Sequence, residues 1–190
     1  VTATIFSDDQ GKTWKAGEIA VPCTDEWINP NETVAIELND GSVMLNVRSE
    51  SKAHRRLITV SKDGATGWST PMFDDALLEP ICMGGIVRYN HGDQNLILFS
   101  NPHNLEGGRG GKPEPGKSRD RRNVSVKISR DEGRTWPENK LLEDGPSMYS
   151  DIAVTQSGTI LCFYGRGTKP GFAGAGLTLA RFNLEWLTSP

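Results

Sequence analysis

The stretch Ser129–Trp136 reads SRDEGRTW, with Asp two residues after Ser, Gly two residues later, Thr two after that and Trp at the end. The stretch Ser7–Trp14 (SDDQGKTW) repeats this spacing in full, and Ser61–Trp68 (SKDGATGW) keeps the Ser, the Asp and the Trp without the fixed Gly and Thr. Each copy follows a short β-like run, so each is predicted to be a hairpin turn. In such a turn a short polar side chain accepts amide hydrogen bonds, Gly supplies positive φ, and Trp packs back onto the strands.

The number of copies decides the fold class. One turn of this kind would indicate only a hairpin. Three copies separated by about 50 to 70 residues indicate a repeated β unit, which is typical of a β-propeller. Short alternating or apolar runs of about five to eight residues recur between Gly, Asp, Asn and Pro, and no helical periodicity of useful length is present. The sequence therefore predicts an all-β fold.

The expected strands form a meander of four-stranded antiparallel blades. Residues 1–22 hold two strands around the first turn motif, and in each later round the motif joins strands three and four. The expected strands are 33–38, 42–47, 56–60 and one after Trp68, then 81–89, 95–99, 123–128 and one near Lys140, then 150–154, 159–164 and 177–182. Residues 1–190 thus amount to roughly three to four blades, fewer than most closed propellers contain, so we expect part of a larger propeller.

Composition excludes several classes of function. The net charge is −3 over 190 residues, so neither nucleic acid nor a polybasic membrane contact is indicated. No apolar run is long enough to span a membrane, and no secretory leader opens the sequence, although a longer parent chain could carry one. The three cysteines are Cys23, Cys82 and Cys162, and their spacing matches no metal-binding motif, so no metal site is expected. They are expected to be buried free thiols; one disulfide with a third, free thiol remains an open alternative.

Two segments are exceptions to the strand pattern. Residues 102–120 are rich in Gly, Pro and charge, and a loop of that length in a compact domain is usually functional or mobile. Residues 165–176 have a similar composition. We assign no secondary structure to either segment and predict a mobile loop over 102–120.

Strand direction predicts which polar residues converge. If strand one of each blade starts at the mouth of the central channel, strand two ends there, strand three starts there, and the turn motifs lie at the opposite end. The polar residues at the mouth are then one acid, several guanidiniums and a phenol: Glu32, Arg48, Arg121 with Arg122, and Tyr149. Paired guanidiniums are suited to holding a carboxylate, and a carboxylate beside a phenol can assist its deprotonation. The set contains no metal-ligand pattern, so no cofactor is expected.

These segments resemble the C-terminal half of a sialidase (neuraminidase) of the Asp-box, or BNR-repeat, family, a six-bladed propeller. The segment from Asn31 to Arg48 matches the stretch that carries the family's catalytic Glu and second substrate-binding Arg. The segment GPSMYSDI (145–152) resembles the one that holds its nucleophilic Tyr, and GLTLARFNLEWL (176–187) its final strand. The resemblance implies these roles: Tyr149 as nucleophile, Glu32 as its base, and Arg48 and Arg121 as substrate-binding residues, with Arg122 and Arg119 as alternatives to Arg121.

The resemblance also implies an activity. It predicts an exo-alpha-sialidase that cleaves terminal sialic acids from glycoconjugates with retention, acting on a sialylated glycan without a cofactor. Sialidases with a tyrosine nucleophile are an exception among glycosidases, which otherwise rely on two carboxylates. The alternative is a non-catalytic sialidase-like propeller that binds acidic glycans. A propeller that cleaves glycans with two carboxylates is disfavoured by the Tyr149 and Glu32 pair.

The sequence departs from the family pattern at several points. The family's first Arg and its acid/base Asp belong to an N-terminal half that this sequence does not include, so we expect this chain alone to be inactive. Gly165 stands where family members often have a Glu, and Met83 stands in a segment that commonly reads Gln-Gly-Ser. Both departures affect the expected pocket. Family resemblance slightly favours a secreted or extracytoplasmic location.

Overall fold

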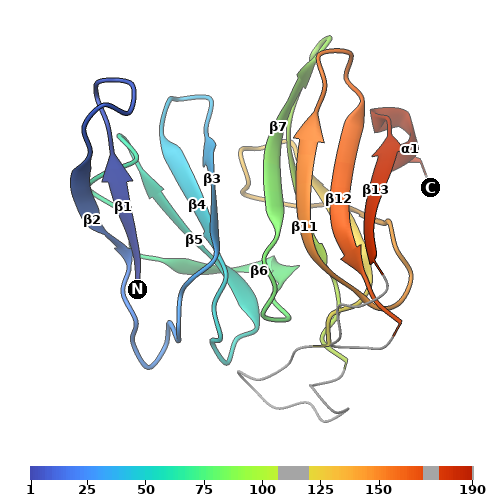
Figure 1. Cartoon of the computed structure of the whole chain (residues 1–190), viewed down its shortest axis with the longest axis horizontal. Coiled ribbons are helices and arrows are strands. Elements are labelled where there is room, and N and C mark those ends of the chain that lie inside the picture. The colour runs from blue at the N-terminus through green and yellow to red at the C-terminus, as the bar shows by residue number, and fades with distance from the viewer. Residues whose placement is uncertain (107–119, 169–175, 190) are drawn as a thin grey trace.

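The computed structural model describes residues 1–106, 120–168 and 176–189, which form four antiparallel sheets and one short helix (Figure 1). The elements are β1 (Thr2–Phe6), β2 (Lys15–Val21), β3 (Thr33–Glu37), β4 (Val43–Val47), β5 (Arg55–Ser61), β6 (Met72–Leu78), β7 (Gly85–His91), β8 (Gln94–Pro102), β9 (Val124–Ser129), β10 (Glu138–Leu141), β11 (Ser147–Val154), β12 (Ile160–Arg166), β13 (Gly176–Phe182) and α1 (Leu184–Thr188). Each sheet pairs consecutive strands: β1-β2, β3-β4-β5-β6, β7-β8-β9-β10 and β11-β12-β13. The predicted all-β meander is confirmed.

Short turns set the register of these sheets. Glu37 pairs with Val43 across the β3–β4 turn, in which Gly41 has a φ of +82°. The β7–β8 turn contains Gly92 with a φ of +59°, and His91 pairs with Gln94 beside it. Glycine adopts positive φ without steric cost, so these turns close in the few residues that the sequence allows.

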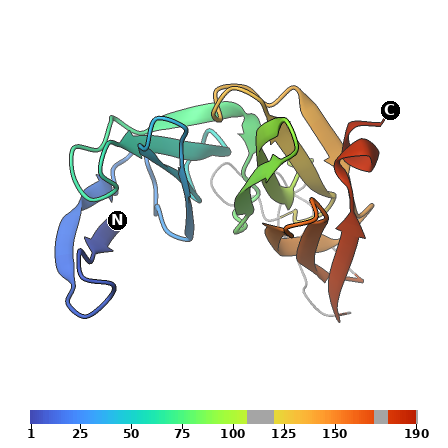
Figure 2. The ribbon, with the colours of Figure 1, turned by 90° about the horizontal axis from the view of Figure 1, so that it is seen from above.

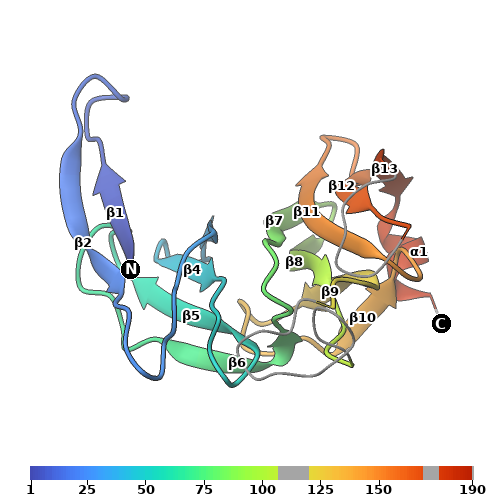
Figure 3. The ribbon, with the colours of Figure 1, turned by 60° about the horizontal axis from the view of Figure 1, so that its bottom comes forward.

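The sheets follow one another along an open arc and pack face to face (Figures 2 and 3). One apolar cluster lies between the second and third sheets and contains Ile36, Met44, Leu77, Ile97, Phe99 and Trp136. Another joins the third and fourth sheets and contains Tyr89, Leu96, Leu98, Val126, Ile128, Ile152, Ile160 and Leu187. Strand β8 and strand β9 are buried almost throughout because sheets cover both of their faces. This is the stacking of propeller blades.

The three repeated turns have the predicted capping chemistry. In the third copy Asp131 accepts the amide of Thr135 at 2.9 Å and its hydroxyl at 2.7 Å, while the Ser129 hydroxyl accepts the amide of Gly133 at 2.8 Å. In the second copy the sequence shows no Gly or Thr at the fixed positions. There Thr66, one residue early, supplies the equivalent amide and hydroxyl to Asp63, both at 2.7 Å.

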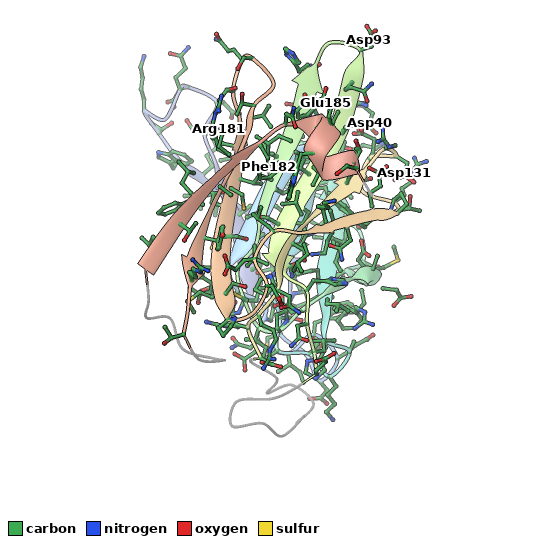
Figure 4. All side chains as sticks on the ribbon, turned by 90° about the vertical axis from the view of Figure 1, so that its right-hand side faces the viewer. Asp40, Asp93, Asp131, Arg181, Phe182 and Glu185 are labelled. Carbon is green, nitrogen blue, oxygen red and sulfur yellow. The ribbon has the colours of Figure 1, made fainter. Side chains whose placement is uncertain are left out.

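These turns lie at the end of the sheets opposite to the predicted mouth. Figure 4 shows Asp131 of the third turn in the upper part of the molecule, together with the hairpin residues Asp40 and Asp93. Trp136 is buried and donates its indole N–H to Asp74 at 2.9 Å. The prediction that every motif Trp packs onto strands is wrong for Trp14, which is 60% exposed at the outer hairpin.

Some boundaries and one element differ from the sequence prediction. The strand expected from Ile81 begins only at Gly85, because Ile81 has a φ of +57° and cannot extend the ladder. The helix α1 was not predicted; its five residues are too few to show a period, and Asn183 caps it by accepting the Trp186 amide at 3.0 Å. Most of the predicted 102–120 loop, namely 107–119, lies outside the described residues, as do 169–175.

The cysteines are free thiols. Cys82 and Cys162 are buried, as expected, but the prediction is wrong for Cys23, which is exposed. Among the helices of the described residues, none has the length and apolar content needed to cross a membrane.

Candidate active site

The ends of β3 and β4 place Glu32 opposite Arg48. Glu32 directly precedes β3 and Arg48 directly follows β4, and the antiparallel pairing of the two strands continues past both ends. The Arg48 amide donates to the Glu32 carbonyl at 3.2 Å, and the Asn31 amide donates to the Arg48 carbonyl at 3.0 Å. The sixteen-residue step between the acid and the guanidinium is therefore the length of one hairpin.

Tyr149 reaches this pair from the fourth sheet. It is the third residue of β11, which begins three residues earlier than the sequence predicts and carries a register irregularity between Ser147 and Ser150. Its hydroxyl donates to Glu32 Oε1 at 2.9 Å and accepts from Arg48 Nη1 at 3.2 Å. Arg48 Nη1 also donates to the second carboxylate oxygen of Glu32. An acid, a phenol and a guanidinium thus form a closed triangle of hydrogen bonds.

The electrostatics keep Arg48 charged. Burial of this side chain opposes its charge, but the hydrogen bond to Glu32 and the Glu32 charge outweigh burial, so the pKa of Arg48 is raised. The Arg48 side chain is 8% exposed, whereas that of Glu32 is 34% exposed. Tyr149 is 41% exposed. The guanidinium therefore forms the floor of the site, and the phenol faces outward.

Arg121 stands over the ring of Tyr149, with its guanidinium carbon 4.9 Å from the ring centroid. Its Nη2 donates to the Ile81 carbonyl at 2.6 Å. The alternative, Arg122, donates instead to the buried Asp120 at 2.9 Å, and no contact with Tyr149 is found for it among the described residues. The third alternative, Arg119, lies outside the described residues. Of the two described candidates, Arg121 is the one that contacts Tyr149.

Both guanidiniums retain unused donor capacity. The Nε–H groups of Arg48 and Arg121 are buried and have no acceptor among the described residues. Buried donors are normally paired, so two unpaired guanidinium N–H groups in one site are unusual. Two guanidiniums that meet at one phenol are suited to an anion with several acceptor oxygens, such as a carboxylate.

The sequence analysis did not find a buried ion pair behind these residues. Arg56 on β5 and Glu79 after β6 are both fully buried and hydrogen-bonded to each other. Burial raises the pKa of Glu79, and the charge of Arg56 opposes that rise. One feature of the sequence could have indicated this pair. Arg56 lies in the largely apolar run RRLITVS of a central strand, where an unpaired charge would be costly, so a buried acidic partner is to be expected.

The structure also places the two sequence departures. Gly165 is buried on β12, and a Cβ there would lie 2.6 Å from Met148 Cγ. Met148 thus fills the space into which a side chain at 165 would project. Met83 is partly buried in the segment between β6 and β7.

The described residues contain no cluster of three or more His, Cys, Asp or Glu side chains that could hold a metal ion. Cys82 directly follows Ile81, whose carbonyl accepts from Arg121. Burial raises its pKa to about 12, with Arg121 opposing that rise, so the thiol is neutral at physiological pH.

Comparison with known proteins gives a consistent result. The family described as "BNR repeat-like domain" matches residues 2–162. The sialidase of Micromonospora viridifaciens is 32% identical over 97% of this chain and 25% of its own length, and that of Bacteroides fragilis is 30% identical over 84% and 27%.

Solved structures agree. The Hadza microbial sialidase Hz136 superposes with a TM-score of 0.74 at 26% identity, covering 97% of this chain and 32% of that chain. The intramolecular trans-sialidase from Ruminococcus gnavus gives 0.75 at 20% identity, over 98% and 38%, which shows the shared fold. This chain spans about a quarter of the length of the two curated relatives.

Proposed function

Because the chain belongs to the BNR-repeat family, and its curated relatives are sialidases, we propose that it carries the nucleophile half of an exo-alpha-sialidase active site. The substrate would be a terminal sialic acid on a glycoconjugate. The observation that carries the proposal is the 2.9 Å hydrogen bond from the Tyr149 hydroxyl to Glu32, with Arg48 bonded to both groups.

Each residue type suits a substrate with a carboxylate on its anomeric carbon. A carboxylate nucleophile would meet that negative charge at close range, whereas a neutral phenol does not. Arg48 and Arg121 would hold the substrate carboxylate and orient the ring. The contacts of both guanidiniums with Tyr149 support this role.

The proposed reaction has two displacements. Glu32 takes the phenolic proton as the Tyr149 oxygen bonds to the anomeric carbon, and the glycosidic C–O bond breaks as the leaving glycan oxygen gains a proton from a general acid. Water then attacks the same carbon and gives up a proton to the conjugate base of that general acid. The tyrosyl C–O bond breaks, and the Tyr149 oxygen recovers its proton from Glu32. Two inversions give net retention. The family resemblance assigns the role of general acid to an Asp.

The test replaces Tyr149 with Phe in the full-length protein and measures release of a fluorogenic leaving group from an α-sialoside. Loss of the nucleophile is expected to lower kcat by about 10³-fold or more. The matched control is Tyr164→Phe, because Tyr164 also donates to a glutamate, Glu143, at 2.8 Å, and this pair shares no hydrogen bond with Glu32 or Arg48 among the described residues. This control should keep its rate and lose about 1 kcal/mol of stability.

The outcomes separate the two candidate functions. An unchanged rate in folded Tyr149→Phe protein would remove Tyr149 from the nucleophile role. If the unmodified full-length protein binds free sialic acid but releases no leaving group, the non-catalytic acidic-glycan binder is the better description.

A further inference from the structure

The segment Glu79–Gly84, between β6 and β7, runs behind the candidate site in a strained conformation. Ile81 is fully buried and has a φ of +57°, a conformation that a β-branched residue rarely adopts. Such strain persists only where surrounding contacts over-determine the backbone. The Ile81 carbonyl is also the acceptor that holds Arg121 over Tyr149, at 2.6 Å.

The contacts that fix this segment come from the buried pair Arg56 and Glu79. Glu79 Oε1 accepts the Cys82 amide at 2.7 Å, and Arg56 Nη1 donates to the Cys82 carbonyl at 3.2 Å and to Glu79. Both polar groups of Cys82, the residue after Ile81, are therefore held by one ion pair.

The Arg56 guanidinium also donates hydrogen bonds to β4, the strand that ends one residue before Arg48. Arg56 Nη2 donates to the Asn46 carbonyl at 3.0 Å, and its Nε donates to the Asn46 side-chain oxygen at 2.5 Å. Asn46 lies two residues before Arg48 at the end of β4. One buried side chain thus joins the backbones that carry both substrate-facing arginines.

We propose that Arg56 and Glu79 are positioning residues that fix Arg48 and Arg121 relative to each other. They would thereby set the distance between the two guanidiniums that bind the substrate carboxylate. This rests on the proposed function, in which those arginines bind that carboxylate. A role in stability alone explains the pair poorly, because apolar side chains of similar volume usually stabilise a core as well as a buried ion pair does. The directed hydrogen bonds from Arg56 to Glu79, Cys82 and Asn46, by contrast, hold a defined geometry.

The test is the double variant Arg56→Met/Glu79→Leu in the full-length protein, which removes both charges together and leaves neither buried alone. We expect folded protein whose KM for an α-sialoside rises by about tenfold or more, the effect of one misaligned charge-assisted hydrogen bond. We expect kcat to change less. A purely structural role would lower the amount of active protein without moving KM.

The matched control is Arg88→Met/Glu132→Gln. Arg88 and Glu132 form a partly buried ion pair at 2.8 Å near the turn motifs, away from the site. This control should leave KM unchanged. If the first double variant does not fold, Arg56→Gln/Glu79→Gln replaces it: both charges are again removed together, the two amide side chains can still hydrogen-bond to the backbone, and KM should still rise severalfold.

A crystal structure of the charge-free variant provides a readout that does not depend on activity. We expect Arg121 to leave its position 4.9 Å from the Tyr149 ring and Ile81 to relax from positive φ. An unmoved Arg121 together with an unchanged KM would overturn the proposal. If the unmodified protein shows no sialidase activity, the proposed function fails, and the position of Arg121 in the variant still decides whether the ion pair places it.

Discussion

Tyr149 is more exposed than either of its hydrogen-bond partners, and this difference describes the site at the scale of single residues. The buried Arg48 donates to the phenol and to Glu32 at once, so it orients the proton acceptor and the phenol together. Arg121 covers the ring from the other side. Three side chains from two neighbouring sheets therefore act on one phenol of a third sheet, which is consistent with its proposed role as the nucleophile.

The contact between Gly165 and Met148 gives a prediction at the same scale. Gly165→Glu should destabilise the protein by about 2 kcal/mol or more, because its Cβ would lie 2.6 Å from Met148 Cγ and its carboxylate would enter a buried site. Adding Met148→Ala should recover part of that loss by opening the space. Chemical denaturation of the two single variants and the double variant measures this coupling, and strictly additive effects would contradict the packing argument.

At the scale of elements, the turn motifs connect neighbouring sheets as well as closing hairpins. Glu132 of the third motif accepts the Asn39 amide at 2.8 Å from the second sheet and pairs with Arg88 on β7. Gly67 of the second motif donates to Glu18 on β2 at 2.8 Å. The second and third turn motifs thus each form a hydrogen bond to the preceding sheet, so the repeat in the sequence corresponds to a repeated contact between sheets.

Acid should weaken these turns. Hydrogen bonds from Thr13 lower the pKa of Asp9 from 3.8 to about 2. For Asp131, burial would raise the pKa, but hydrogen bonds from Thr135 and Ser129 outweigh it, and the net shift is downward. Because the folded pKa values lie below the unfolded value, the unfolded chain takes up protons first as pH falls. This stabilisation is complete above about pH 4 and is lost towards pH 2.

The variant Thr135→Val isolates this effect, since it removes the hydroxyl that donates to Asp131 at 2.7 Å. It should cost about 1 kcal/mol at pH 6, and the acid-induced loss should become smaller. Denaturant unfolding from pH 6 to pH 2 measures both quantities. The control Thr13→Val removes the same contact in the outer two-stranded hairpin, where we expect a smaller global effect. Equal effects of the two variants would argue against the inter-sheet role of the third turn.

At the scale of the whole molecule, the arc of sheets depends on close approach of the innermost strands (Figure 3). Gly85 opens β7, and a Cβ there would lie 2.8 Å from Asp151 Cα and from the Ile152 nitrogen on β11. These are backbone atoms in a paired strand, so they cannot yield as a flexible side chain can. The third and fourth sheets can meet at this distance only because residue 85 has no side chain.

We therefore predict that Gly85→Ala destabilises the protein by about 2 kcal/mol or more, as expected for overpacking against backbone. The control is Gly92→Ala, where no atom lies within 4 Å of the added Cβ and only the positive φ opposes the substitution. That control should cost about 1 kcal/mol. Thermal unfolding of both variants measures the difference, and equal costs would show that the sheets tolerate a wider separation.

Much of the fold could be predicted because its signals are local. Alternating runs and turn residues predict the meander, and Glu32 and Arg48 lie opposite each other because they flank one hairpin. The second turn motif was only partly recognised, because Thr66 performs the Thr role one residue early. The replacement of the usual Thr by Thr66 depends on the backbone geometry of the turn, so the fixed residue spacing of the motif does not show it.

The sequence by itself determined the strands, their antiparallel order and the end of the sheets at which the polar residues gather, because these follow from alternation and from hydrogen bonds between near neighbours. Only the tertiary structure decided that Arg121 covers Tyr149 while Arg122 pairs with Asp120. It also revealed the buried Arg56 and Glu79 pair. The contacts of Arg121 with Tyr149 and of Arg56 with Glu79 join distant segments of the chain, and their partners are chosen by tertiary packing, which no local pattern in the sequence records.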